Sequence, residues 1–79
     1  MLVKRSLALS GHRTSVALEP EFWATLDAVA ALRGQAVAAL VASVDATRAA
    51  DQPLASALRV LALAAAGRRA ADDRPDDAG

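Results

Sequence analysis

The chain has 79 residues, no cysteine and one histidine, so one small domain without disulfides or a protein-built metal centre is expected. Alanine accounts for 22 residues, and such small side chains bury little apolar area, which predicts that oligomerisation completes the core. The net charge of zero combines a basic head, with Lys4, Arg5, Arg13 and no acid in residues 1–18, with an acidic tail.

Two N-terminal stretches alternate as half-buried strands do. Residues 14–18 and the preceding arginine form two faces, one with Thr14, Val16 and Leu18 and the other with Arg13, Ser15 and Ala17. Residues 2–9 are a second extended candidate, with Val3, Leu7 and Leu9 opposite Lys4, Ser6 and Ala8. Between them, Ser10-Gly11 either closes a hairpin or bends one long strand, and the sequence leaves both open.

The first helix is predicted from Pro20 to Arg33, because proline after Glu19 suits a first helical turn and Gly34 suits a helix end. Helical spacing then aligns one apolar stripe, made of Phe22, Trp23, Leu26, Val29 and Ala30. A second helix from about Ala36 to Ala49 carries a stripe of Val37, Leu40, Val41 and Val44. The short connection predicts that these two helices pack as a corner.

A third helix is predicted from Pro53 to about Ala66, with Gly67 as its stop. One stripe contains Leu54, Leu58, Leu61 and Ala65. Val60 and Leu63 lie outside that stripe, which indicates contact with a second subunit. Residues 1–69 are therefore expected to form the domain, and residues 70–79 an acidic, disordered tail.

The order strand, helix, glycine turn, helix resembles the ribbon-helix-helix family. The sequence is more similar still to the motif of one bacterial branch of this family, across residues 3–63. The matching segments are Lys4-Arg5-Ser6, Gly11-His12-Arg13-Thr14-Ser15-Val16, Leu18-Glu19, Phe22-Trp23 and Ser56-Ala57-Leu58-Arg59. The resemblance implies a mainly α fold with a short N-terminal β-ribbon, a dimer and an additional C-terminal helix. In such dimers one strand from each subunit pairs antiparallel, and the ribbon enters the DNA major groove.

The resemblance also implies which residues meet DNA. Arg13, Ser15 and Ala17 would face the bases, although Ala17 offers only a methyl contact. Lys4 and Arg5 would form a basic arm or a phosphate clamp. A phosphate would bind backbone N–H groups near Gln35, Ala36 and Val37, because alanine replaces the serine or threonine that often caps the second helix in the family.

An obligate homodimer joined across residues 14–18 is expected, because a lone strand leaves backbone donors and acceptors unpaired. Its shared core would contain the inward residues of the strand and of both helices. This predicted dimer core consists of Thr14, Val16, Leu18, Phe22, Trp23, Leu26, Leu40, Val41 and Val44.

The function predicted from these features is sequence-specific binding of double-stranded DNA by a small bacterial transcriptional regulator that needs no cofactor. The alternative is a protein-interaction module, like an antitoxin, that binds a partner protein through its third helix or tail. No serine or threonine lies in a recognisable arrangement with a base, so an enzyme is not expected. The most apolar stretch, residues 54–66, is too short to span a bilayer, which favours a cytoplasmic protein.

Overall fold

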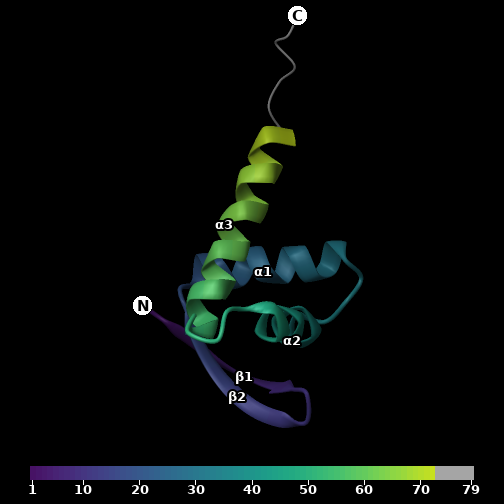
Figure 1. The fold of residues 1–79 in the computed structure, drawn as a ribbon. Helices are drawn as coiled ribbons and strands as arrows, with labels where there is room; N and C mark the ends of the chain where they lie inside the picture. The colour runs from purple at the N-terminus through teal and green to yellow at the C-terminus, as the bar shows by residue number, and fades with distance from the viewer. Residues whose placement is uncertain (73–79) are drawn as a thin grey trace, which may run out of the picture.

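The computed structural model describes the backbone of residues 1–72 and the side chains of residues 1–68. Two strands, β1 (Val3–Leu9) and β2 (His12–Leu18), precede three helices, α1 (Pro20–Leu32), α2 (Val37–Thr47) and α3 (Leu54–Asp72). The hairpin lies on one side of α1 and α2, and α3 extends away from it (Figure 1). The predicted class, mainly α with an N-terminal ribbon and an additional C-terminal helix, is confirmed.

The two strands pair antiparallel within the chain, with Val3 opposite Leu18 and Leu9 opposite His12. Their turn is made by Ser10 and Gly11, whose φ angles of 46° and 86° are both left-handed. Two successive left-handed residues are the mark of a type I′ turn, whose twist matches that of a hairpin. The structure therefore chooses the hairpin over the single long strand.

This pairing occupies one edge of β2, and the expected pairing of β2 with its copy in a second subunit stays a prediction for the other edge. Along residues 12–18 the partner strand is β1 of the same chain. One edge of β2 therefore has its backbone groups satisfied within the chain. The opposite edge of each strand has no strand beside it in the described chain.

The first helix has the boundaries that its sequence predicts. Pro20 occupies the first turn directly after the N-cap Glu19. At the other end Gly34 takes a φ of 67°, and the Gln35 N–H donates to the Ala30 carbonyl oxygen at 3.0 Å. This bond belongs to a Schellman cap, which requires a left-handed residue at the position of Gly34, and glycine adopts that conformation without strain.

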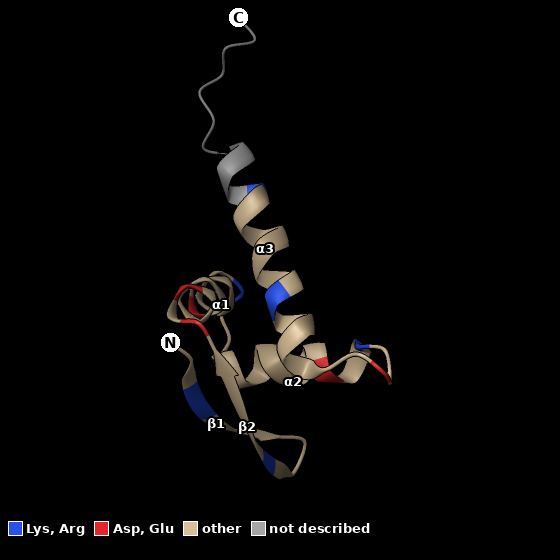
Figure 2. Ribbon diagram, turned by 90° about the vertical axis from the view of Figure 1, so that its left-hand side faces the viewer, with Lys and Arg blue, Asp and Glu red and all other residues tan. Residues whose placement is uncertain are grey.

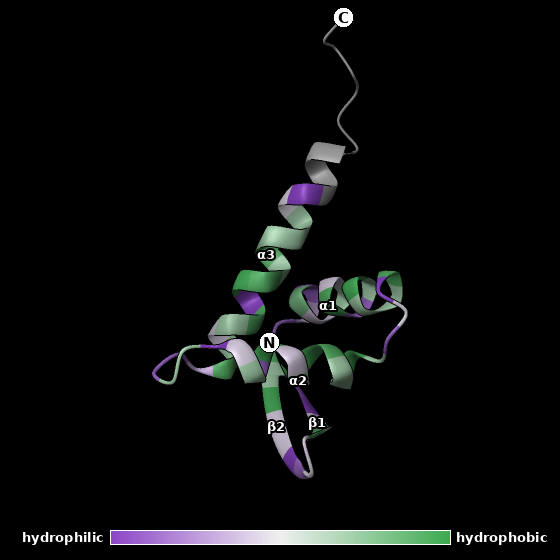
Figure 3. Ribbon diagram, turned by 45° about the vertical axis from the view of Figure 1, so that its right-hand side comes forward, coloured by the Kyte–Doolittle hydropathy of each residue, from purple (hydrophilic) through white to green (hydrophobic). Residues whose placement is uncertain are grey.

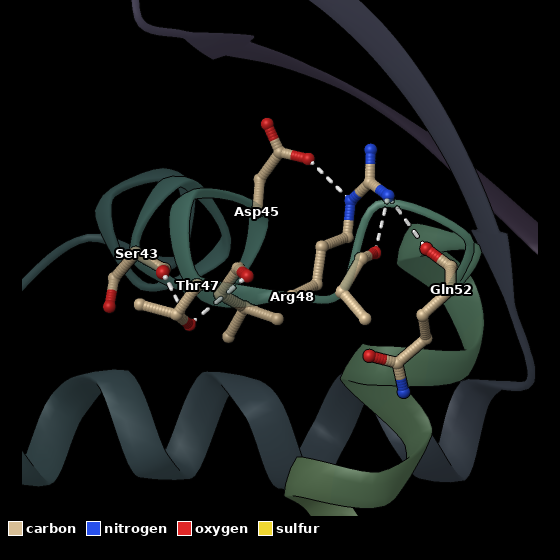
Figure 4. A network of polar contacts seen from close by, with 7 residues as sticks. Ser43, Asp45, Thr47, Arg48 and Gln52 are labelled. Carbon is tan, nitrogen blue, oxygen red and sulfur yellow. Dashed lines mark hydrogen bonds and ion pairs between the residues drawn. The ribbon is translucent and has the colours of Figure 1, made fainter.

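A bend of 98° separates α1 from α2, as the short connection predicts. After α2, the Arg48 side chain donates from Nε to Asp45 Oδ1 at 2.8 Å and from Nη1 to the Gln52 carbonyl oxygen at 2.7 Å (Figure 4). This guanidinium fixes the loop that leads to α3. Within residues 1–72 no single helix is long and apolar enough to cross a bilayer, and α1 and α2 meet that criterion only together, across their bend.

The third helix is longer than predicted. It continues through Gly67 to Asp72, and Gly67 does not take the left-handed conformation that ends α1. A helical glycine costs about 1 kcal/mol relative to alanine, and the alanines on both sides favour continuation. Residues 70–72 of the predicted tail therefore belong to α3, and residues 73–79 lie outside the described part of the chain.

The core lies between the inner face of the hairpin and the three helices, which place their apolar residues against it (Figure 3). Its most completely buried side chains come from every element: Leu9, Leu18, Trp23, Leu26, Leu40, Val41 and Leu58. By contrast, Val60 and Leu63 are 59% and 63% exposed, in agreement with their place outside the α3 stripe. One chain therefore buries apolar side chains from all five elements, and the expectation that oligomerisation completes the core stays a prediction.

Candidate nucleic-acid interface

The hairpin presents one face to solvent, and both strands contribute to it. We call this surface the outer face: Lys4, Ser6 and Ala8 of β1, with Arg13, Ser15 and Ala17 of β2. The register sets Lys4 opposite Ala17, Ser6 opposite Ser15 and Ala8 opposite Arg13. All six are exposed except Ala17, which is half-buried. The predicted outward orientation of Arg13, Ser15 and Ala17 on β2 is confirmed. β1 adds three further residues to the same face.

The outer face is basic and has no acidic neighbour on the hairpin. Residues 1–18 contain no aspartate or glutamate, whereas acids occur on α1 and around the end of α2 (Figure 2). Lys4 and Arg13 therefore project from a surface on which nothing competes for an anionic ligand. A positive surface without nearby carboxylates attracts phosphate groups.

Arg13 is oriented by a neighbour from the other strand. Its Nη1 donates to Ser6 Oγ at 3.2 Å. Arg13 lies opposite Ala8, so Ser6 is its diagonal neighbour on the same face, within reach of a long side chain. Arginine has five N–H donors, and this bond uses one, so the rest of the guanidinium is available to a ligand.

Arg5 lies on the other face of β1, and the structure separates it from Lys4. Its guanidinium donates to both carboxylate oxygens of Asp27, at 2.9 and 3.0 Å, and lies 4.5 Å from the centroid of the Trp23 ring. The hydrogen bonding of Arg5 to the Asp27 carboxylate, which accepts, raises the pKa of Arg5 above its ordinary value. In addition, Trp23 Nε1 donates to the Val3 carbonyl oxygen at 2.7 Å. In this arrangement Arg5 joins β1 to α1 instead of extending toward a ligand.

The start of α2 keeps only part of its predicted donor set. The Gln35 N–H already donates to the Ala30 carbonyl oxygen as part of the cap of α1. Ala36 is the N-cap of α2 and forms no side-chain cap. The N–H groups of Ala36 and Val37 remain as donors from the predicted set, since the first turn of a helix has no acceptors of its own for them.

A family model described as a ribbon-helix-helix domain matches residues 2–66, which include both strands, α1, α2 and most of α3. The chain belongs to the ribbon-helix-helix family. Proteins of this family generally form dimers and bind DNA, and they are typically regulators without enzymatic activity. The family therefore agrees with the order of elements and with an exposed basic ribbon.

Among solved structures, the ribbon-helix-helix chain is similar to an uncharacterized protein from Bordetella pertussis Tohama I, with a TM-score of 0.73 and 34% sequence identity. The match covers 99% of this chain and 66% of that protein, so this chain spans about two thirds of its length. No match was found among the curated proteins.

For this ribbon-helix-helix domain, most of the predicted dimer core is occupied within one chain. Six of the nine residues are buried in it: Val16, Leu18, Trp23, Leu26, Leu40 and Val41. Thr14, Phe22 and Val44 keep part of their surface exposed. In the conformation described here, only these three of the nine have much surface to offer a second subunit.

Two features near the ribbon do not follow from sequence reasoning. Arg59 Nη2 lies 2.9 Å from Glu19 Oε1, and its guanidinium is 5.7 Å from the centroid of the Phe22 ring. This link joins α3 to the strand-to-helix junction across 40 positions, too far for any local signal. The second feature is Ser6, whose outward phase is visible in the sequence but whose contact with Arg13 depends on the hairpin register.

Proposed function

We propose that this chain binds double-stranded DNA in a sequence-dependent manner, as a homodimeric transcriptional regulator in the bacterial cytoplasm, with the outer face of its hairpin in the major groove. The sequence motif of its N-terminal segment resembles that of a bacterial branch of the family, which supports this assignment. The similar protein from Bordetella pertussis is also bacterial. No cofactor or catalytic step is part of the proposal.

The observation that carries the proposal is the outer face itself. A two-stranded ribbon fits the major groove, and arginine is well suited to read guanine through two hydrogen bonds. Arg13 is exposed on this ribbon and has donors to spare beyond the one given to Ser6. Lys4 on the same face would contact phosphate, whose contribution is independent of sequence.

The test is a binding titration with wild type and Arg13→Ala on a duplex selected from a random pool and on its scrambled version. Loss of an arginine that reads guanine is expected to cost about 1–3 kcal/mol per subunit on the selected duplex and to reduce the preference over the scrambled one. Arg68→Ala is the matched control, because it removes the same charge from an exposed position on α3.

Equal affinities of both proteins for both duplexes would remove Arg13 from the site. A uniform loss on both duplexes would assign it to phosphate instead of bases. A salt series adds a second readout, because each phosphate contact steepens the fall of log affinity with log salt. Lys4→Ala is expected to make that slope shallower by about one.

A second candidate function is binding of a partner protein. A groove of about 380 Å³ lies between α2 and α3, and its lining includes Val44, Val60, Leu61 and Arg68. Val60 is also among the large apolar side chains that the chain leaves exposed. A Val60→Asp variant that binds DNA normally but loses a partner would favour this function, and the DNA titration separates the two.

A further inference from the structure

The outer face contains two strands from one chain, which changes what a single subunit can do on DNA. β1 and β2 pair along their whole length, from Val3 opposite Leu18 to Leu9 opposite His12. One subunit therefore carries a complete two-stranded ribbon, with Ser6 and Lys4 beside Ser15 and Arg13. No strand from a second subunit is needed to form it.

One hairpin is narrow enough to enter a major groove. Neighbouring strands lie about 4.8 Å apart, so the two strands of one hairpin fit a groove about 12 Å wide. Residues of both β1 and β2 on the outer face can therefore approach the bases together.

Within that surface, Ser6 is the residue that acts on Arg13. Both side chains are exposed, and Ser6 Oγ accepts a hydrogen bond from Arg13 Nη1 at 3.2 Å. A long arginine side chain loses rotamer freedom when it binds, and a partner that already holds it reduces that loss. The remaining N–H groups of the guanidinium stay free for a base, and the Ser6 hydroxyl keeps its own hydrogen to donate.

We infer that Ser6 is a positioning residue for base recognition: it holds the Arg13 guanidinium across the hairpin in the orientation that meets a guanine in the major groove. The inference rests on the proposed function, since it concerns the same surface. It adds β1 to a reading surface that sequence reasoning assigned to β2 alone. It also makes the specificity of Arg13 depend on a residue seven positions earlier in the chain.

The experiment is a double-mutant cycle on the full chain, with the selected and scrambled duplexes as probes. Ser6→Ala is expected to weaken binding to the selected duplex about three- to tenfold, the equivalent of ordering one long side chain, and to leave the scrambled duplex nearly unaffected. In an Arg13→Ala background the same change is expected to cost less than about twofold, because Ser6 then has nothing to position.

Two further variants separate positioning from a structural effect. Ser6→Thr keeps the hydroxyl on an exposed strand position and is expected to retain wild-type preference. Ser43→Ala removes an exposed hydroxyl from α2 and is expected to change neither affinity nor preference. Thermal melting by circular dichroism checks that all variants remain folded, which is expected because the Ser6 side chain is exposed.

The outcomes distinguish the inference from the function on which it rests. If the wild-type chain prefers neither duplex, the proposed function fails. If the wild type discriminates and Arg13→Ala abolishes the preference, but Ser6→Ala behaves as wild type, only the role of Ser6 is overturned. The role of Ser6 would also be overturned if the fold losses in affinity of Ser6→Ala and Arg13→Ala simply multiplied in the double variant. A Ser6→Thr variant that binds the selected duplex as weakly as Ser6→Ala would overturn it too.

Discussion

At the scale of single residues, four arginines of this chain have two kinds of environment that the sequence does not distinguish. Arg5, Arg48 and Arg59 each bind a carboxylate and join two elements or close a loop. Arg13 binds only a serine hydroxyl and keeps most of its donors. The positive charge available to DNA is therefore smaller than the count of basic residues indicates, and Lys4 and Arg13 carry the part of it that lies on the outer face.

Glu19 provides a prediction at this scale. Its carboxylate faces its own backbone N–H and accepts a hydrogen bond from Arg59, and both lower the pKa of Glu19 below its ordinary value. A lowered carboxyl pKa contributes stability above its ordinary range, and that contribution disappears as pH falls through the lowered value. Arg59→Gln is therefore expected to destabilise the chain near neutral pH and to differ less from wild type in acid.

A side-chain NMR titration measures the effect directly. The pKa of Glu19 is expected to rise toward its ordinary value in Arg59→Gln and to stay low in Arg68→Gln, which alters an exposed arginine of the same helix. An unchanged pKa in Arg59→Gln would mean that the backbone N–H alone accounts for the shift.

At the scale of elements, α3 is the part whose role differs most between its two faces. One face buries Leu58 completely and places Ala62 and Ala65 against α1 and the rest of the core. The other exposes Val60 and Leu63. A helix that is apolar on both sides normally contacts structure on both sides, so the exposed face is the one available to a partner.

Two leucine substitutions separate these faces. Leu58→Ala is expected to lower the free energy of unfolding by about 2–5 kcal/mol, because it removes a fully buried side chain and leaves a cavity. Leu63→Ala, the same chemical change on the exposed face, is expected to alter it by less than about 0.5 kcal/mol. Urea denaturation followed by circular dichroism measures both. Equal losses would show that a partner subunit covers Leu63 under the conditions of the experiment.

At the scale of the whole molecule, the hairpin changes the geometry expected of a dimer on DNA. If each subunit inserts its own hairpin, the two copies of the outer face lie in separate major grooves on one side of the duplex. Such grooves recur at about 34–36 Å, or about 10–10.5 base pairs, from centre to centre. Two strands that share one groove would instead recognise overlapping or directly adjacent repeats.

Spacing in the selected duplexes therefore tests the arrangement. Half-sites are expected about one helical turn apart, and inserting five base pairs between them is expected to weaken binding strongly, because it rotates one half-site to the far side of the duplex. Inserting ten base pairs restores the facing and serves as the control. Half-sites that overlap within one groove would contradict separate insertion and favour strand pairing between subunits. Sedimentation at micromolar concentration gives the number of chains independently.

The sequence by itself determined the local features. Strand alternation set which residues of β1 and β2 face outward, and helical spacing set the buried stripes of α1, α2 and α3, because these periods follow from backbone geometry. Pro20 and Gly34 marked the ends of α1 through their restricted and permissive φ angles. Gly67 shows the limit of such signals, since glycine permits a helix end without requiring one.

Only the tertiary structure decided which groups meet across the chain. A serine-glycine turn is compatible with a hairpin or a bend, and the pairing of β1 with β2 shows that it closes a hairpin. The same pairing places Ser6 within hydrogen-bond distance of Arg13. Packing of the hairpin on α1 places Arg5 within hydrogen-bond distance of Asp27. These contacts join residues 7 and 22 positions apart, and no sequence period relates them, because they depend on strand register and on the packing of one element against another.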